Sequence, residues 1–310
     1  MSFNNWLDAD AALKMVWQFK EPFATVFKHL NPAGACKAGD ILKAWKGAWN
    51  CDPMSAFGGI AGVNMTVTKK VAEDITDRKF LEAIIAPDYD DDALEILREK
   101  EKLRVLKINT KMPADPGLDL RPVCGGFLAQ EFDYSELTPD DLVYLEDKGI
   151  RKPTDEQIGD MLFGWKVIRR TKSNTVLLVR DGATVGIGAG QQNRVDAGFI
   201  ACYRANKPYE KLKGVNRTRP SSKLEELTDY IGLQTQGRTE GSVAVSSAFY
   251  PFPDTIEVLN AFGVKASLSP AGSIRDEASY EAMRQNNMAA AHTPHIESGG
   301  YEGGIRAFLH

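Results

Sequence analysis

The chain has 310 residues, of which 43% are hydrophobic and 26% are charged, and its formal net charge is -4. These values are typical of a folded protein with a large core, and the length suggests about two domains. The sequence has no basic tract, signal-peptide pattern or long apolar run, so we expect a cytoplasmic protein that binds neither nucleic acid nor a membrane. The widely spaced Cys36, Cys51, Cys124 and Cys202 form no metal or redox motif.

The first hundred residues alternate between apolar runs and amphipathic segments, which predicts an α/β fold. We expect helices over residues 8–18, 39–49, 71–76 and 93–102, and strands over residues 23–27, 57–63, 83–86 and 103–108. Residues 109–158 are richer in Pro, Asp and Gly, which indicates a less regular connection.

The second part of the chain shows the same alternation. A helix is expected over 156–170, a hairpin and a further helix follow, and 208–241 is a polar connecting stretch. Strands over 242–246, 265–268 and 288–292 then alternate with helices over 255–262 and 276–287. Residues 26–32 and 244–251 both resemble a strand, a polar pair and a proline, which is compatible with two related halves. We therefore predict a first half over 1–125, a connector over 126–158 and a second half over 159–310.

A lysine and a histidine stand together at the end of the first predicted strand. Lys28 and His29 follow the apolar run 23–27, and the chain then turns through Pro32 and Gly34. Open α/β sheets bind their ligands at the carboxyl ends of strands. An ammonium beside an imidazole favours the neutral form of the ring, which can act as a base. A solvated strand end and a hydrogen-bonded core histidine are the structural alternatives.

The hairpin expected over residues 175–190 is rich in glycine, with Asp181 and Gly182 at its turn. Its Gly-x-Gly-x-Gly run over 186–190 fits a dinucleotide fingerprint poorly, because that fingerprint belongs in a parallel strand–helix turn and its third glycine comes one residue later. We interpret the strand as a backbone surface on which a flat ligand lies, with donors from 191–194 beside it. The alternative for 191–194 is the solvated start of a helix.

Seven stretches in chain order resemble the AICAR transformylase (phosphoribosylaminoimidazolecarboxamide formyltransferase) part of a bifunctional purine-biosynthesis enzyme. They are Phe27–Gly34, Ser55–Gly59, Ile84–Pro87, Lys172–Asn174, Gly186–Arg194, Ala248–Phe252 and Pro270–Asp276. The resemblance runs from about Asn4 to His310 and implies two cytidine-deaminase-like α/β/α halves with mixed sheets. It also implies a homodimer with active sites across the subunit interface, which transfers the formyl group of 10-formyltetrahydrofolate to the 5-amino group of AICAR.

The resemblance assigns roles to individual residues. His29 matches the proton acceptor and Lys28 the neighbouring transition-state stabiliser. Positions that hold the nucleotide correspond to Gly58, Glu82, Asn174, Arg194, Phe249 and Arg306, and positions around the folate correspond to Val195, Asp254, Ser273 and Ile274. Taken singly, Phe249 is typical of a core, Asp254 of a helix cap and Glu82 of a solvated strand edge.

No metal site is expected. The chain lacks the His-x-Glu and Pro-Cys-x-x-Cys zinc ligands of the deaminases, and the neighbouring His292 and His295 have no evident third ligand.

The sequence departs from the family pattern in several places. The cyclohydrolase part has no counterpart here, so closure of the IMP ring is not expected. An Arg-Tyr-Gly-x-Asn-Pro-His-Gln segment, which grips the substrate phosphate in the family, is also missing. Ser247 and Pro253 stand where Asp and Arg are usual. A formyltransferase is the first hypothesis, and a non-catalytic relative that binds purine nucleotide or folate is the second. The intact Lys28 and His29 favour the enzyme.

Overall fold

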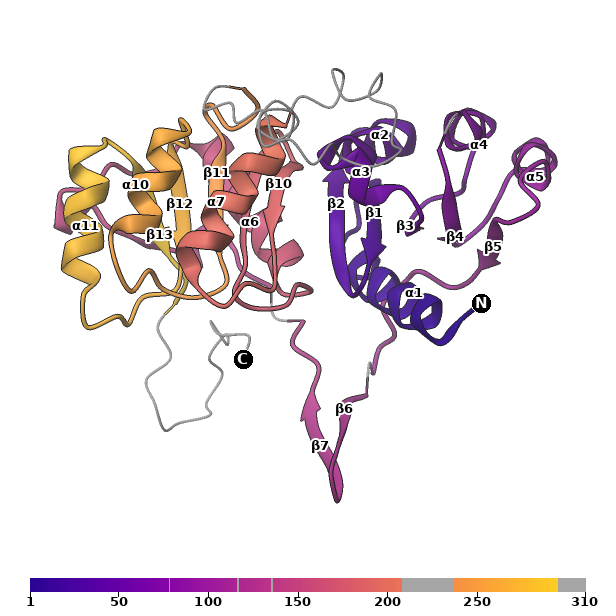
Figure 1. Cartoon of the computed structure of the whole chain (residues 1–310), viewed down its shortest axis with the longest axis horizontal. Helices are drawn as coiled ribbons and strands as arrows, with labels where there is room; N and C mark the ends of the chain where they lie inside the picture. The colour runs from indigo at the N-terminus through magenta and orange to yellow at the C-terminus, as the bar shows by residue number, and fades with distance from the viewer. Residues whose placement is uncertain (78, 116, 135, 208–236, 295–310) are drawn as a thin grey trace, which may run out of the picture.

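The computed structural model describes residues 1–77, 79–115, 117–134, 136–207 and 237–294. Eleven of the described strands form one mixed sheet between two layers of helices (Figure 1). The strand order is β5-β4-β3-β1-β2-β10-β9-β11-β12-β13-β8, and a separate two-stranded sheet is formed by β6 and β7. The predicted α/β class is therefore confirmed. No described helix is long and apolar enough to cross a membrane.

The first part of the chain builds one side of the large sheet. Its strands are β1 (Phe23–Lys28), β2 (Asn31–Lys37), β3 (Gly59–Val63), β4 (Leu81–Ala86) and β5 (Arg104–Lys107). Its helices are α1 (Phe3–Val16), α2 (Ile41–Cys51), α3 (Pro53–Ala56), α4 (Lys69–Thr76) and α5 (Asp91–Arg98). The helices and strands predicted for this part are all present, and β2 is an additional strand.

The second part builds the other side. Its strands are β9 (Val176–Arg180), β10 (Ala183–Gly188), β11 (Val243–Ser246), β12 (Ala266–Ser269) and β13 (Ala289–His292). Its helices are α6 (Asp155–Ile168), α7 (Arg194–Asn206), α10 (Asp254–Ala261) and α11 (Asp276–Gln285). These elements also match the prediction to within a few residues at their ends.

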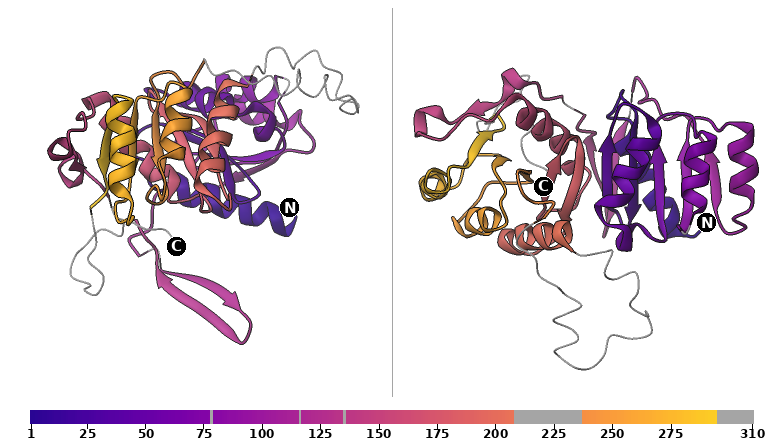
Figure 2. Two further views of the ribbon diagram at one scale, coloured as in Figure 1. Left: turned by 60° about the vertical axis from the view of Figure 1, so that its left-hand side comes forward. Right: turned by 90° about the horizontal axis from the view of Figure 1, so that it is seen from above.

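The helices cover the sheet unequally (Figure 2). On one face α1 and α6 share a single apolar core with both parts of the sheet, which includes Met15, Phe23, Phe163 and Leu177. On the other face the core divides into two, one under α2, α4 and α5 and one under α7, α10 and α11. The shared core and the pairing of β2 with β10 make one continuous body from the two parts.

The sheet order is a mirrored repeat: β5-β4-β3-β1-β2 meets β10-β9-β11-β12-β13. Both central hairpins have a two-residue turn with positive φ, at His29–Leu30 and at Asp181–Gly182. A buried aspartate on α1, Asp8, accepts both backbone N–H groups of the first turn at 3.0 and 2.6 Å. Asp160 on α6 accepts both of the second at 3.0 and 2.8 Å. The two halves therefore repeat one design.

The repeat corrects the internal echo expected from the sequence. Residues 26–32 form the turn of the β1–β2 hairpin, whereas 244–251 lead from β11 toward α10, so the two segments are not equivalent in the fold. The counterpart of the β1–β2 hairpin is the β9–β10 hairpin, whose turn Asp181–Gly182 is as predicted.

The segment after His29 is a buried strand, which corrects the expected turn through Pro32 and Gly34. Pro32 pairs with Phe27 where the β1–β2 register shifts, so its missing N–H falls at an irregularity of the ladder. A Cβ at Gly34 would lie 2.0 Å from the Ala48 carbonyl oxygen. Glycine is therefore needed here because α2 packs directly on the backbone of β2.

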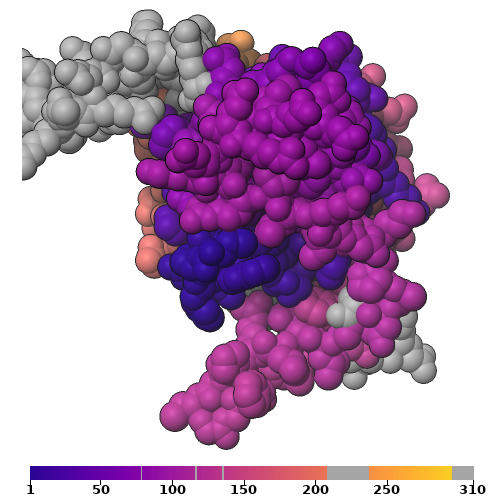
Figure 3. Space-filling model, turned by 90° about the vertical axis from the view of Figure 1, so that its right-hand side faces the viewer, coloured from indigo at the N-terminus to yellow at the C-terminus, as the bar shows by residue number. Residues whose placement is uncertain are grey.

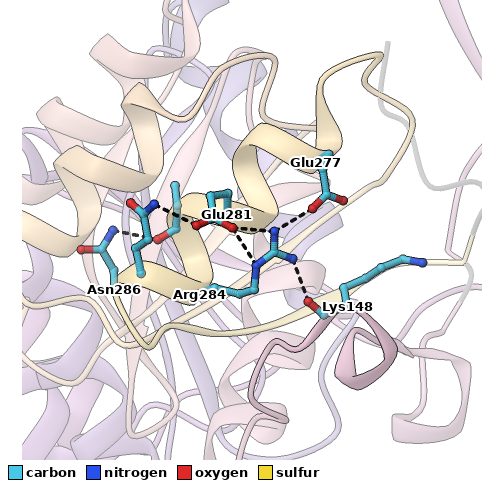
Figure 4. Close-up of polar contacts among 7 residues, drawn as sticks. Lys148, Glu277, Glu281, Arg284 and Asn286 are labelled. Carbon is cyan, nitrogen blue, oxygen red and sulfur yellow. Dashed lines mark hydrogen bonds and ion pairs between the residues drawn. The ribbon is translucent and has the colours of Figure 1, made fainter.

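Residues 118–148 join the two halves and contain more structure than expected. They form β6 (Leu118–Val123), β7 (Gly126–Glu131), η1 (Pro139–Asp141), β8 (Val143–Tyr144) and η2 (Glu146–Lys148). The predicted boundary at residue 125 thus falls in the turn between β6 and β7. β8 pairs with β13. Arg284 on α11 bonds the Lys148 carbonyl at 2.8 Å and pairs with Glu277 and Glu281, which fastens η2 to the second half (Figure 4).

Candidate active site

The β1–β2 turn presents Lys28 and His29 at the edge of the sheet. His29 and Leu30 have φ values of 57° and 62°, a backbone region that His tolerates better than most residues. The Asp8 carboxylate holds the two backbone N–H groups of this turn from α1, and the His29 side chain is exposed. The imidazole is therefore displayed to solvent on a backbone that a buried carboxylate fixes.

Lys28 and Gly58, which are both predicted site residues, lie close together. The Lys28 ammonium donates to the Phe57 carbonyl oxygen at 2.8 Å, and a Cβ placed on Gly58 would be 3.9 Å from Lys28 Nζ. Gly58 has a φ of 76°, which favours glycine. An ammonium has three N–H donors, so two remain for a ligand after the bond to Phe57.

Asn174 and Arg194 form a second group at the same edge. Arg194 donates to Asn174 Oδ1, to the Thr175 carbonyl at 2.9 Å and to Ser247 Oγ at 2.8 Å. The Asn174 amide donates to the Gln191 carbonyl at 3.0 Å. All three acceptors of Arg194 are uncharged, its Nε has no partner within the described residues, and the residue is only 7% exposed. Burial lowers the pKa of this guanidinium below its ordinary value. A buried cation that faces only neutral groups is suited to an anionic or strongly polar ligand.

One polar bridge joins the two groups. Asn31, at the start of β2, accepts the backbone N–H of Lys172 at 3.0 Å, and Lys172 accepts the N–H of Gly190 at 2.8 Å. Asn174 follows Lys172 by two residues and exchanges backbone bonds with Gln191 at 3.0 and 3.1 Å. The Lys28–His29 turn of the first half therefore lies beside the Asn174–Arg194 group of the second half. We call these two groups and their bridge the shared edge.

The other predicted nucleotide residues are placed less uniformly. Phe249 is half-buried just after β11, two residues beyond Ser247 in the Arg194 group. Glu82 lies on β4 and forms an ion pair with Arg104 of β5, so its carboxylate already has a partner. Arg306 lies outside the described residues.

The four predicted folate residues lie at ends of second-half elements. Val195 follows Arg194 in the first turn of α7, and Asp254 begins α10, where it accepts the Thr255 N–H at 2.7 Å. Ser273 and Ile274 lie in the loop after β12, and the Ile274 side chain is fully exposed. The strands β10, β11 and β12 run in the same direction, because β9 is antiparallel to both β10 and β11 and β12 is parallel to β11. These loops therefore follow the carboxyl ends of strands at one edge of the sheet, where ligands of α/β sheets bind.

The glycines of β10 have a different role from the one expected. A Cβ at Gly186 would lie 2.1 Å from the Ala201 carbonyl oxygen, and one at Gly188 would lie 2.0 Å from that of Ala197. Both residues belong to α7, so these glycines let the helix pack on the strand. They do not form a surface for a flat ligand.

Asp8 and Ser247 belong to the shared edge although sequence reasoning gave neither a role there. Asp8 was expected only at the start of a helix, but α1 begins five residues earlier, at Phe3, after a Ser2 cap. The spacing of Asp8, Ala12 and Met15 puts Asp8 on the buried stripe of α1. A carboxylate on an apolar stripe is the signal that could have identified it.

No three or more His, Cys, Asp or Glu side chains in the described parts of the chain gather as metal ligands would. His292 is buried and fully bonded: one ring nitrogen lies 2.9 Å from the Ser269 carbonyl oxygen and the other 3.0 Å from the Tyr280 hydroxyl. Burial lowers its pKa. His295, its expected neighbour, lies outside the described residues.

Comparison with known proteins identifies the family of the chain. Residues 1–204 match the family described as the AICARFT/IMPCHase bienzyme. The bifunctional purine biosynthesis protein PurH of Caldicellulosiruptor saccharolyticus is 36% identical over 310 residues, which cover 100% of this chain and 52% of the relative. PurH of Rhodospirillum rubrum is 38% identical over 313 residues, which cover 100% of this chain and 53% of the relative. This chain thus spans about half the length of these relatives, and it belongs to the AICARFT/IMPCHase bienzyme family.

Proposed function

We propose that this chain is an AICAR formyltransferase of purine (IMP) biosynthesis, which transfers the formyl group of 10-formyltetrahydrofolate to the 5-amino group of AICAR. Membership of the family and the matched half of the PurH relatives support the assignment. The observation that carries it is the shared edge. There the exposed imidazole of His29 and the ammonium of Lys28 lie beside the buried Arg194, whose hydrogen-bond acceptors are all uncharged. IMP cyclohydrolase activity is not part of the proposal.

The chemistry needs a base and a charge stabiliser. The AICAR amine is a poor nucleophile because its lone pair is delocalised toward the carboxamide. In the proposed step the amine nitrogen bonds to the formyl carbon, His29 accepts the amine proton, and the bond from that carbon to N10 of the folate breaks as N10 takes a proton. A positioned base contributes about 10²–10⁴ in rate. Lys28 stabilises the oxygen charge of the tetrahedral intermediate, which is worth about 3 kcal/mol for one such donor.

Substrate positioning is assigned to the second half. The Asn174 amide is assigned to the AICAR carboxamide, and the Arg194 guanidinium beside it is assigned to a polar or anionic group of the nucleotide. Gly58, Glu82, Phe249 and Arg306 complete the proposed nucleotide site. Val195, Asp254, Ser273 and Ile274 form the proposed folate side, at the loops after β10, β11 and β12. The proposal requires no metal.

The protein is proposed to work as a cytoplasmic homodimer with its active sites at the subunit interface. Its four cysteines are free, which suits a reducing compartment.

A direct assay tests the function. Purified protein is mixed with AICAR and 10-formyltetrahydrofolate, and the appearance of tetrahydrofolate is followed. We expect tetrahydrofolate to form only when both substrates are present. Tight binding of AICAR without any turnover would contradict the proposal and would favour a non-catalytic nucleotide-binding relative.

A further inference from the structure

The side-chain amide of Asn31 contacts both halves of the chain at the shared edge. Its Oδ1 accepts the backbone N–H of Lys172 at 3.0 Å, and its Nδ2 donates to the carbonyl oxygen of His29 at 3.3 Å. Asn31 also pairs with Lys28 across the β1–β2 turn. One amide therefore touches the backbone of the proposed base and the segment that leads to Asn174.

These two contacts need an amide. The N–H of Lys172 requires an acceptor, and the carbonyl oxygen of His29 requires a donor. A carboxylate supplies only acceptors and an ammonium only donors, while an aliphatic side chain supplies neither. Asparagine supplies one of each on a short side chain, so Asn31 can hold both backbone groups at once.

The bond between Asn31 and Lys172 lies away from the strand pairing that joins the halves. β2 and β10 are neighbours at the centre of the sheet (Figure 1), and their ladder pair joins Cys36 to Ala183, at the opposite end of β2 from Asn31. Seen from its own side, the first half stands in front of the second, which shows only at the margins (Figure 3). The halves thus meet along the central hairpins, and a side-chain contact links them at the end that carries the proposed site.

The Lys172 segment can transmit this contact to Asn174. The carbonyl oxygen of Lys172 accepts the N–H of Gly190 at 2.8 Å and the hydroxyl of Thr175 at 2.6 Å. Asn174 exchanges two backbone bonds with Gln191, at 3.0 and 3.1 Å. Lys172 and Asn174 thus belong to one hydrogen-bonded unit, so a shift of Lys172 also moves Asn174.

We propose that Asn31 is a positioning residue, which sets the placement of the His29 base relative to Asn174 through its two amide bonds. The inference rests on the proposed function, in which Asn31 has no assigned role. Asn31 touches no reacting atom in the proposed step, and it acts through the two groups that do. Formyl transfer depends on this placement, because a displacement of about 1 Å can lower a rate about 100-fold.

Asn64 makes comparable contacts at the other end of β1. Its Oδ1 accepts the N–H of Phe23 at 2.8 Å, and its Nδ2 donates to the carbonyl oxygens of Phe19 and Glu21 at 3.0 and 2.7 Å. Asn64 and Asn31 are both half-buried. Since Phe23 begins β1 and the shared edge lies at its end, Asn64 is a matched control for an amide that bonds the backbone away from the proposed site.

Three variants of the full chain separate the two bonds. Asn31→Leu removes both, Asn31→Asp keeps the acceptor for the Lys172 N–H and removes the donor to His29, and Asn64→Leu is the control. Steady-state formyl transfer gives kcat on its high-pH plateau, where an altered titration of the base does not enter. Calorimetry gives the dissociation constant for AICAR at physiological salt, which screens the charge that Asn31→Asp adds.

The two Asn31 variants should differ in affinity but not in turnover. We expect Asn31→Leu to lower kcat about tenfold or more and to raise the dissociation constant for AICAR about fivefold or more, because Asn174 loses its link to the first half. Asn31→Asp should lower kcat by a similar factor and leave the dissociation constant within about threefold, because the Lys172 bond is kept. Asn64→Leu should leave both quantities within about twofold.

Hydrogen exchange of the free chain tests the contact without any substrate. Asn31 accepts the Lys172 N–H, so exchange in residues 171–175 should rise in Asn31→Leu and should stay as in wild type in Asn31→Asp and Asn64→Leu. Thermal unfolding should show a midpoint for Asn64→Leu at least as low as that for Asn31→Leu, because Asn64 makes one more bond. If Asn64→Leu does not fold, Asn64→Asp replaces it, since it keeps the bond to Phe23.

Unchanged exchange of residues 171–175 in Asn31→Leu would overturn the inference. Equal losses of kcat in Asn31→Leu and Asn64→Leu would also overturn it, because Asn31 would then act only through stability. A wild-type chain that transfers no formyl group, but shows the expected exchange in each variant, would contradict the proposed function alone. An Asn31→Leu protein with the kcat of an active wild type would contradict this inference alone.

Discussion

Asp8 and Asp160 make the same pair of backbone contacts in the two halves, but only the Asp8 turn carries His29. Comparing the two aspartates therefore distinguishes what this pair of backbone contacts contributes to stability from what it contributes to the proposed catalysis. An exposed imidazole needs a fixed backbone to act as a base, because small displacements of a catalytic group cost much of the rate. We therefore propose that Asp8 positions His29, the proposed base.

Asp8→Asn and Asp160→Asn test this role as a pair. Each replaces a charged acceptor of two hydrogen bonds, so both should lower the free energy of unfolding by about 1–3 kcal/mol. We expect Asp8→Asn to lower kcat for formyl transfer about tenfold or more, and Asp160→Asn to leave kcat within about twofold. Urea unfolding and steady-state assays measure the two effects. Equal loss of kcat in both variants would show that Asp8 acts only through stability.

His292 is expected to make the stability of the fold depend on pH. Burial lowers its pKa in the folded state, so the unfolded chain, with an ordinary value of about 6.5, binds a proton more readily. Stability is therefore fully present above about pH 6.5 and declines as the pH falls toward the folded pKa, with a slope of at most about 1.4 kcal/mol per pH unit. Urea unfolding at several pH values should show a smaller decline for His292→Gln than for wild type. Identical pH profiles would rule out this residue as the cause.

Among the elements, the glycines of the central strands are explained by the helices that pack on them. Gly34, Gly186 and Gly188 lie under α2 and α7, where any Cβ would meet a helix carbonyl oxygen at about 2 Å. The sequence suggested a ligand surface for β10, because a run of glycines marks close approach without saying what approaches. Only the positions of Ala197 and Ala201 identify the neighbour as a helix.

Gly188→Ala and Gly159→Ala distinguish this packing from general glycine effects. A Cβ at Gly188 would meet the Ala197 carbonyl at 2.0 Å, whereas one at Gly159, inside α6, meets nothing within 4 Å. We expect Gly188→Ala to lower the free energy of unfolding by about 1–3 kcal/mol, and Gly159→Ala to raise it by about 0.5–1 kcal/mol. Urea unfolding of both variants measures the difference. A stable Gly188→Ala protein would contradict the packing account.

The sequence predicted most helices and strands but not the β1–β2 hairpin. Asp181–Gly182 was recognisable as a turn because glycine supplies positive φ, while His29–Leu30 makes the equivalent turn without glycine or asparagine. The buried Asp8 carboxylate stabilises that turn from another element, which a local pattern cannot reveal. The β6–β7 hairpin was not predicted for a different reason: its alternating residues lie within a segment rich in Pro, Asp and Gly, a composition that indicates a loop.

In the whole molecule, the candidate site depends on both halves of the repeat. The ordered motifs predicted Lys28, His29, Asn174 and Arg194, and the bridge from Asn31 to Lys172 joins their two groups. The sequence could not predict which carbonyl and hydroxyl groups Arg194 contacts, or that Glu82 pairs with Arg104. These contacts join residues that are distant in sequence. The site follows from the meeting of the two central hairpins.

Formyl transfer by a His29→Asn variant tests the central claim most directly. Asparagine tolerates the positive φ of this position, so the change removes the imidazole and spares the turn. Tetrahydrofolate release gives kcat, and calorimetry gives the affinity for AICAR. We predict that kcat falls about 100-fold or more while the affinity for AICAR stays within about threefold. A His29→Asn protein with the turnover of wild type would contradict the assignment of His29 as the base.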